Sequence, residues 1–94
     1  MVKLLQIRPS KKKNKKYDAI YSDGKSVSFG AKGYSDYTIH KNPERKRRYL
    51  ARHKKRENWT KSGMKTAGFL SRWILWNLPD LRASFLDTKK RFNI

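Results

Sequence analysis

Apolar and polar positions alternate in the first third of the chain, which is typical of strands with one buried face. The alternation predicts a short strand at residues 2–8 and two more at residues 17–21 and 26–30. The Asp23-Gly24 pair between the last two predicts a tight hairpin of type I′, because that turn needs positive φ at both central residues. This part of the chain is therefore expected to form a small antiparallel hairpin sheet, with a third strand from its first residues.

The rest of the chain shows helical spacing and helix start signals. Asn42, Thr66 and Asp80 each stand before a helical pattern and are residue types that accept hydrogen bonds at a helix N-cap. The predicted helices cover residues 43–57, 67–77 and 81–91. Together with the hairpin they predict a single α+β domain over residues 1–94, in which residues 9–16 form a basic arm or loop.

The helix predicted at 67–77 is apolar on most of its circumference. At 100° per residue, Phe69, Trp73 and Trp76 form one stripe, whereas Leu70, Ile74 and Leu78 form a second. A helix of this kind must be buried on several sides. We expect its aromatic residues, with Trp59 in the preceding loop, to be anchors of either the domain core or an interface with another subunit.

Two further groups of apolar residues are interpreted as core. Leu81, Phe85 and Leu86 are expected to face inward from the last helix. Tyr34 and Tyr37 follow the hairpin and have two interpretations, because a tyrosine ring can stack on a nucleic-acid base or cover a hydrophobic core. The core is the favoured interpretation for both.

The amino-acid composition says more about the kinds of partner than about the fold. The 94 residues carry a net charge of +18, and their mean hydropathy is -1.01. Such an excess of cations favours polyanions or acidic protein surfaces as partners. Cysteine is absent, which excludes disulfides and thiolate metal sites and is compatible with a reducing compartment such as the cytoplasm or nucleus. No apolar stretch is long enough to span a membrane, and we predict no membrane span.

The positive charge is concentrated in two segments. Residues 1–16 contain seven basic side chains and no acid, and residues 41–57 contain nine basic side chains and two acids. The first segment is interpreted as a solvated loop or as an arm that contacts anions, and the second as a helix that binds nucleic-acid phosphates or carboxylates of another protein. The candidate binding residues are Lys11, Lys12, Lys13, Lys15, Lys16, Arg45, Lys46, Arg47, Arg48, Arg52, Lys54, Lys55 and Arg56.

The sequence offers little for catalysis. Each acidic residue has a local explanation as a turn, cap or surface residue, and His40 and His53 have no carboxylate or cysteine at metal-ligand spacing. No nucleophile motif of the Gly-x-Ser-x-Gly type is present. We predict a protein that is not an enzyme, with no cofactor, metal or small-molecule substrate. Binding to a membrane surface ranks third among the functions considered, because the apolar helix lacks a polar face.

Three segments, at residues 17–37, 44–59 and 65–77, are similar to a family of small basic proteins of large nucleocytoplasmic DNA viruses, the giant viruses of algae and amoebae. The similarity extends over roughly residues 16–93. It implies a virus-encoded protein located in the virion, with packaging, capsid or genome association as its setting. The family has no assigned activity, so no residue roles follow from the resemblance.

Two functions are therefore expected. The first is a non-enzymatic structural component of a large DNA virus particle, of the minor-capsid type, which bridges larger capsid subunits and faces the genome. The second is a nucleic-acid-binding protein that contacts phosphates through its lysine and arginine clusters without base specificity.

Overall fold

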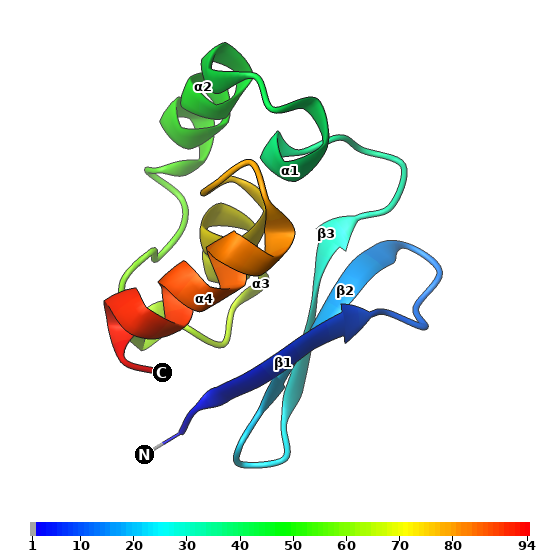
Figure 1. Cartoon of the computed structure of the whole chain (residues 1–94), viewed down its shortest axis with the longest axis vertical. Helices are drawn as coiled ribbons and strands as arrows, with labels where there is room; N and C mark the ends of the chain where they lie inside the picture. Colours follow the sequence, from blue (N-terminus) through cyan, green and yellow to red (C-terminus); the bar gives the residue numbers. More distant parts are fainter. Residues whose placement is uncertain (1) are drawn as a thin grey trace.

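A three-stranded antiparallel sheet, with helices on one of its faces, makes up the structure, a computed structural model that describes residues 2–94 (Figure 1). This confirms the predicted α+β class and the third strand. The elements in chain order are the strands β1 (Leu4–Pro9), β2 (Lys15–Tyr21) and β3 (Ser26–Ala31), the helices α1 (Tyr37–His40) and α2 (Pro43–His53), the 3-10 turn η1 (Lys61–Gly63), helix α3 (Ala67–Leu70), the π-helical turn η2 (Ser71–Leu75) and helix α4 (Leu81–Phe92).

The sheet order is β1-β2-β3, and its register puts the apolar side chains on one face. Ala19 lies opposite Ile7 on β1 and opposite Val27 on β3, and Tyr17 lies opposite Phe29. Alternation along each strand makes these residues point to the same side. The face that they form is covered by α3, η2 and α4, while α1 and α2 lie at the far end of the molecule (Figure 1).

The β2–β3 hairpin has a different turn from the predicted one. Gly24 has a φ of 85°, but Asp23 is not among the positive-φ residues, so the type I′ prediction is wrong. The Tyr21 N–H pairs with the Lys25 carbonyl, which leaves a three-residue loop with glycine in the left-handed position. This is the hairpin in which a type I turn is followed by a bulge.

Residues 10–14 form the turn between β1 and β2 rather than a separate arm. The Ser10 N–H donates to the Lys16 carbonyl at 3.0 Å, and the Lys15 N–H donates to the Lys12 carbonyl at 3.3 Å. The predicted basic arm over residues 9–16 is thus divided between the end of β1, this turn and the start of β2.

The hydrophobic core lies between the sheet and the α3–η2 segment. Leu70 and Ile74, two residues of the second predicted stripe, are fully buried, and Leu75 beside them is 2% exposed. These three side chains fill the core. Phe69 is also fully buried. The buried hydrophobic residues that form the core cluster are Leu4, Ala19, Tyr21, Phe29, Phe69, Leu70, Ile74, Leu75 and Ile94.

The helix boundaries depart from the predicted ones. The Trp76 N–H donates to the Ser71 carbonyl five residues earlier, which closes a π turn and ends the helix at Leu75 instead of residue 77. Leu78 is consequently 37% exposed and does not extend the apolar stripe. Helix α2 ends at His53, four residues earlier than predicted.

Within residues 2–94, every helix is too short or too polar to span a bilayer. The last helix, α4, begins and ends close to its predicted limits. Leu81 and Phe85 pack against the core as predicted. Leu86, predicted to face inward, is 51% exposed because the inward face of α4 is completed by Ser84 and Thr88.

Candidate nucleic-acid interface

A basic groove of about 500 Å³ lies between the end of the sheet and helix α2. We call it the basic groove throughout. One side comes from the start of β2, the end of β3 and the segment that follows β3; the other comes from α2, and α3 and η2 form the floor. It is lined by Lys15, Lys16, Gly30, Ala31, Tyr34, Ser35, Asp36, Arg45, Tyr49, Arg52, His53, Glu57, Ala67, Gly68, Ser71, Leu75 and Trp76.

Three cations of the basic groove have no carboxylate partner among the residues that the structure describes: Lys15, Arg45 and Arg52. Lys16 differs, because its Nζ lies 2.6 Å from Oδ2 of Asp36, which is 2% exposed. The Asp36 side chain also accepts the Thr38 N–H and thereby caps α1. Lys16 therefore neutralises a buried carboxylate, whereas the other three cations are available to an anion.

One face of helix α2 lines the basic groove. Arg45, Tyr49 and Arg52 line the basic groove at positions i, i+4 and i+7. Tyr49 stacks on His53 and on Trp76, with both ring centroids 4.2 Å away, and the planes of Tyr49 and Trp76 differ by 4°. Burial raises the pKa of Tyr49 to about 12, so its hydroxyl stays protonated at neutral pH. The aromatic stack fixes α2 against η2 and holds the two arginines in place.

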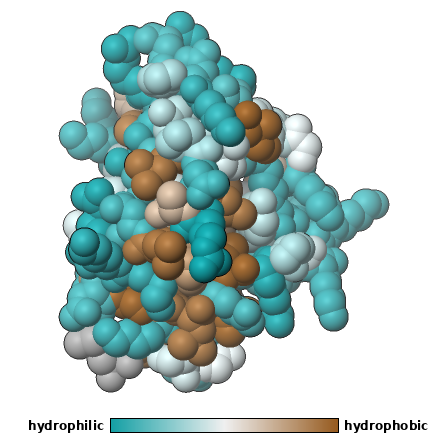
Figure 2. Space-filling view, viewed as in Figure 1, coloured by the Kyte–Doolittle hydropathy of each residue, from teal (hydrophilic) through white to brown (hydrophobic). Residues whose placement is uncertain are grey.

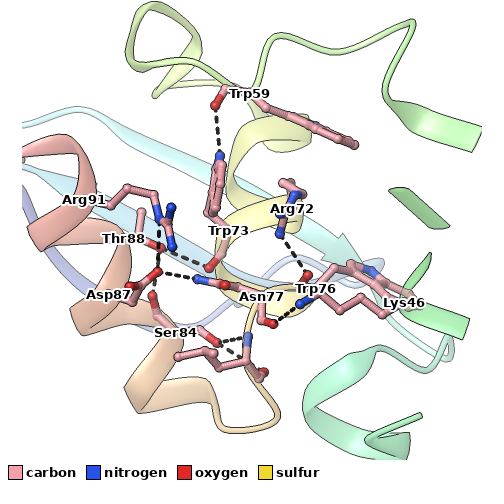
Figure 3. Close-up of polar contacts among 11 residues, drawn as sticks. Lys46, Trp59, Arg72, Trp73, Trp76, Asn77, Ser84, Asp87, Thr88 and Arg91 are labelled. Carbon is pink, nitrogen blue, oxygen red and sulfur yellow. Dashed lines mark hydrogen bonds and ion pairs between the residues drawn. The ribbon is translucent and has the colours of Figure 1, made fainter. Parts of the chain in front are cut away.

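Lys46 lies on the neighbouring, docked face of α2 and contacts Asn77, just after the α3–η2 segment (Figure 3). Its Nζ lies 2.6 Å from the Asn77 carbonyl oxygen and 5.0 Å from the centroid of the Tyr37 ring. Burial, followed by the nearby Arg72, lowers the pKa of Lys46. The ammonium group of Lys46, which the sequence placed among the candidates for binding nucleic acid or an acidic partner, is thus engaged within the fold.

A helix leaves its last carbonyls without backbone donors. At the end of the α3–η2 segment, side chains donate to these carbonyls instead. Arg72 Nη1 donates to the Trp76 carbonyl at 3.0 Å, and Thr88 Oγ1 donates to the Trp73 carbonyl at 2.9 Å (Figure 3). The Ser84 hydroxyl bonds both backbone groups of Leu78. Cations are also favoured at this negative end of the helix dipole.

The three tryptophans are half-buried and pack within the chain. The Arg72 guanidinium lies 4.1 Å from the Trp73 ring centroid and 5.5 Å from that of Trp59, and Trp73 Nε1 donates to the Trp59 carbonyl at 2.9 Å. Burial lowers the pKa of Arg72. With Trp76 stacked on Tyr49 and Phe69 in the core, all four predicted anchors have partners inside the domain.

The remaining predicted binding residues lie around the basic groove rather than in it. Lys11, Lys12 and Lys13 are exposed on the β1–β2 turn, and Lys54, Lys55 and Arg56 are exposed just after α2. Arg47 and Arg48 are exposed as well, but both pair with Glu44. Figure 2 shows hydrophilic side chains covering the end of the molecule that carries α2.

Tyr34 belongs to the basic groove although the sequence interpretation assigned it to the core. It lines the groove and is 74% exposed, so that interpretation is wrong. Tyr37 is half-buried against Lys46. A signal was present in the sequence: Gly33 precedes Tyr34, and a glycine turn places the next side chain at the surface more often than in a core.

Within residues 2–94, no three histidine or acidic side chains come together as a group that could hold a metal ion. The seven carboxylates are instead used within the fold, in ion pairs, caps and hydrogen bonds. Their partners are Ser28 for Asp18, Lys65 for Asp23, Lys16 for Asp36, Arg47 for Glu44, Trp59 for Glu57, Ala83 for Asp80 and Asn77 for Asp87.

The fold and the groove define a small, basic α+β protein whose unpaired cations converge on one concave surface. The chain belongs to DUF5754, a family of unknown function, whose model matches residues 5–53. That segment runs from β1 to the end of α2 and supplies Lys15, Tyr34, Arg45 and Arg52 of the basic groove. No curated protein and no solved structure matches the chain.

Proposed function

We propose that this protein binds the phosphate backbone of nucleic acid without base specificity and without catalysing a reaction. The observation that carries the proposal is the convergence of Lys15, Arg45 and Arg52 on one groove without a carboxylate partner. Phosphates are the anions that such a cluster recognises most readily, and arginine pairs with them through two parallel hydrogen bonds. The exposed lysines of the β1–β2 turn and the cations after α2 extend the positive surface on either side.

The salt dependence of duplex DNA binding tests this proposal. Each phosphate contact releases counterions, so log K should fall with log salt at a slope of about -0.9 per phosphate neutralised. The Arg45→Gln/Arg52→Gln variant is expected to weaken binding and to reduce the slope by about two contacts. Fluorescence anisotropy with a labelled duplex, between about 50 and about 200 mM salt, measures both quantities.

A charge-matched control separates the groove from net charge. Arg8→Gln/Arg82→Gln removes two exposed arginines from β1 and α4 and leaves the same total charge. The proposal predicts a clearly smaller loss of affinity for this control than for the groove variant. Equal losses would show that the groove has no special role, and wild-type binding that does not change with salt would refute phosphate binding altogether.

A second function, a structural component that bridges larger subunits of a large DNA virus particle, is favoured by a separate observation. An apolar groove of about 350 Å³ lies between β1 and α4 and is lined by Leu5, Ile7, Leu81 and Phe85. Leu5 is 55% exposed, and Figure 2 shows hydrophobic groups on the face that carries these elements. Exposed apolar patches of this kind often mark protein interfaces.

The flanking residue Arg82 makes an acidic face of a capsid-type subunit the expected partner of this apolar groove. Protein mass spectrometry of purified particles tests the proposed setting, which the resemblance to viral proteins also supports. Particles in which the chain is absent would rule this second function out. Cross-links from Arg82→Lys to acidic residues of a larger subunit would support it.

A further inference from the structure

Tyr34 has the one highly exposed aromatic ring among residues 2–94, at 74% exposure, and it lines the basic groove. The other tyrosines, tryptophans and phenylalanines are buried or half-buried. The ring of Tyr34 takes no part in the hydrophobic core, and it shares the groove with three cations that have no carboxylate partner among residues 2–94. Protein sites that bind single-stranded nucleic acid combine these two features, a positive groove and aromatic rings on which bases stack.

The backbone fixes where this ring lies. The Tyr34 N–H donates to the Ala31 carbonyl at 3.3 Å, and Gly33 supplies the positive φ of 90° that the turn requires. The Lys32 N–H donates to the Asn14 carbonyl at 3.0 Å, which ties this turn to the β1–β2 turn. The backbone of Tyr34 is therefore held at the edge of the groove by the end of β3 and by the β1–β2 turn.

We propose that the basic groove accepts an unpaired nucleotide of a single strand, with its base stacked on Tyr34 and its flanking phosphates on Lys15, Arg45 and Arg52. The inference rests on the proposed phosphate binding and adds the form of nucleic acid. The groove volume of about 500 Å³ lies within the roughly 300–1,000 Å³ range of small-molecule sites, which leaves room for a base and its sugar.

The chemistry favours a single strand over the other polyanions. A duplex presents phosphates, but its base faces are covered by their stacked neighbours and cannot reach Tyr34. An acidic peptide presents carboxylates without the planar ring that would use an exposed tyrosine. Sequence preference is not expected, because every base has a face on which an aromatic ring stacks.

The test compares two labelled strands of about 12 nucleotides, oligo-dT and an abasic sugar-phosphate strand of the same length, which carry the same phosphates. Wild-type protein should bind oligo-dT at least about fivefold more tightly than the abasic strand. Tyr34→Ala should remove most of that difference while leaving the abasic affinity and its salt slope unchanged. Tyr34→Phe should retain it, since stacking needs the ring and not the hydroxyl.

The control variant is Leu86→Ala, which shortens an exposed apolar side chain on α4. It should leave the ratio of the two affinities at the wild-type value. Since Tyr34 is largely exposed, Tyr34→Ala should fold normally, and near-ultraviolet circular dichroism checks this.

Equal binding of the two strands by wild type, or an unchanged ratio in Tyr34→Ala, would overturn the inference and leave phosphate binding standing. Failure of wild type to bind either strand or a duplex would overturn the proposed function as well.

Discussion

Replacing Thr88 with valine tests whether its hydroxyl group stabilises the end of the α3–η2 segment by donating to the Trp73 carbonyl. Thr88 lies on α4 and is fully buried, with Oγ1 2.9 Å from the Trp73 carbonyl oxygen and 2.7 Å from the Ser84 carbonyl oxygen. Valine has nearly the same shape but no hydroxyl. The Ser84 carbonyl keeps its backbone donor within α4, because an α-helix pairs it with the N–H four residues later. The Trp73 carbonyl lies in the π turn and loses its donor.

The expected cost follows from this single unpaired group. A buried acceptor that loses its donor costs about 1–3 kcal/mol in the free energy of unfolding. For a domain of this size each 1 kcal/mol lowers Tm by about 4–8 °C, so Thr88→Val should lower Tm by roughly 5–20 °C. Thr88→Ser keeps the hydroxyl and removes one methyl group, which should cost only about 1 kcal/mol.

Urea unfolding followed by tryptophan fluorescence measures both variants, since the Trp73 carbonyl accepts the Thr88 hydroxyl and Trp73 lies next to Thr88 (Figure 3). Valine should be more destabilising than serine, because only valine removes the hydroxyl. If serine were the more destabilising of the two, the methyl contacts would matter more than the hydrogen bond to the Trp73 carbonyl, and the explanation of how this helix end is satisfied would be refuted.

Three other changes test separate parts of the structure. Gly30→Ala should destabilise the domain by more than about 1 kcal/mol in urea unfolding, because φ is 78° there and the new methyl group would lie 2.9 Å from Leu75 Cδ1; wild-type stability would contradict this. Lys46→Met should lower Tm but leave the salt slope of DNA binding unchanged. Arg45→Gln should reduce the salt slope but leave Tm unchanged. A reduced slope in Lys46→Met would contradict a purely structural role for Lys46. His40 has a pKa lowered from 6.5 by burial and by Arg45, so protonation favours the unfolded chain and stability should fall as pH drops below about 6.5. The fall between about pH 7.5 and about pH 5 should be smaller in His40→Asn, and an identical pH profile would exclude His40 as its source.

Sequence patterns predicted those elements that depend on local interactions. Alternation located all three strands, and the side chains of Asn42, Thr66 and Asp80 accept backbone N–H groups at the helix starts as expected. These features involve residues that are close in the chain. Strand period also determines which side chains share a face, and Tyr17, Ala19, Val27 and Phe29 lie on one face of the sheet.

The helix ends could not be predicted in the same way, since tertiary contacts decide them. The π turn at Ser71–Leu75 allows Ile74 and Leu75 both to face the core, and the pattern of a regular helix contains no sign of it. The early end at Leu75 depends on donors from α2 and α4 that are distant in sequence. Lys46 was more accessible to prediction: it precedes Tyr49 by three residues and Leu50 by four, which places it on the docked face of α2.

The sequence predicted which cations are candidates for the site, but not how the fold brings some of them together. Charge clustering selected Lys15, Arg45 and Arg52 among many cations, yet only the packing of α2 on the stack of Tyr49 and Trp76 brings them to one groove. Composition gives no information on which lysines are neutralised inside the fold. Tyr34 was assigned to the core because its exposure depends on a turn tied to another turn across the sheet.

The positive surface has a further consequence for stability. Buried or half-buried cations such as Lys16, Lys46 and Arg72 bind internal acceptors, and each of the seven carboxylates has a partner inside the fold. Seven acidic against 25 basic side chains leave most surface cations uncompensated, and a net charge of +18 on 94 residues opposes compaction. An anionic partner that binds the folded chain relieves this repulsion and stabilises it by mass action. Under the proposed function, the same unpaired cations would weaken the free protein and favour its complex with nucleic acid.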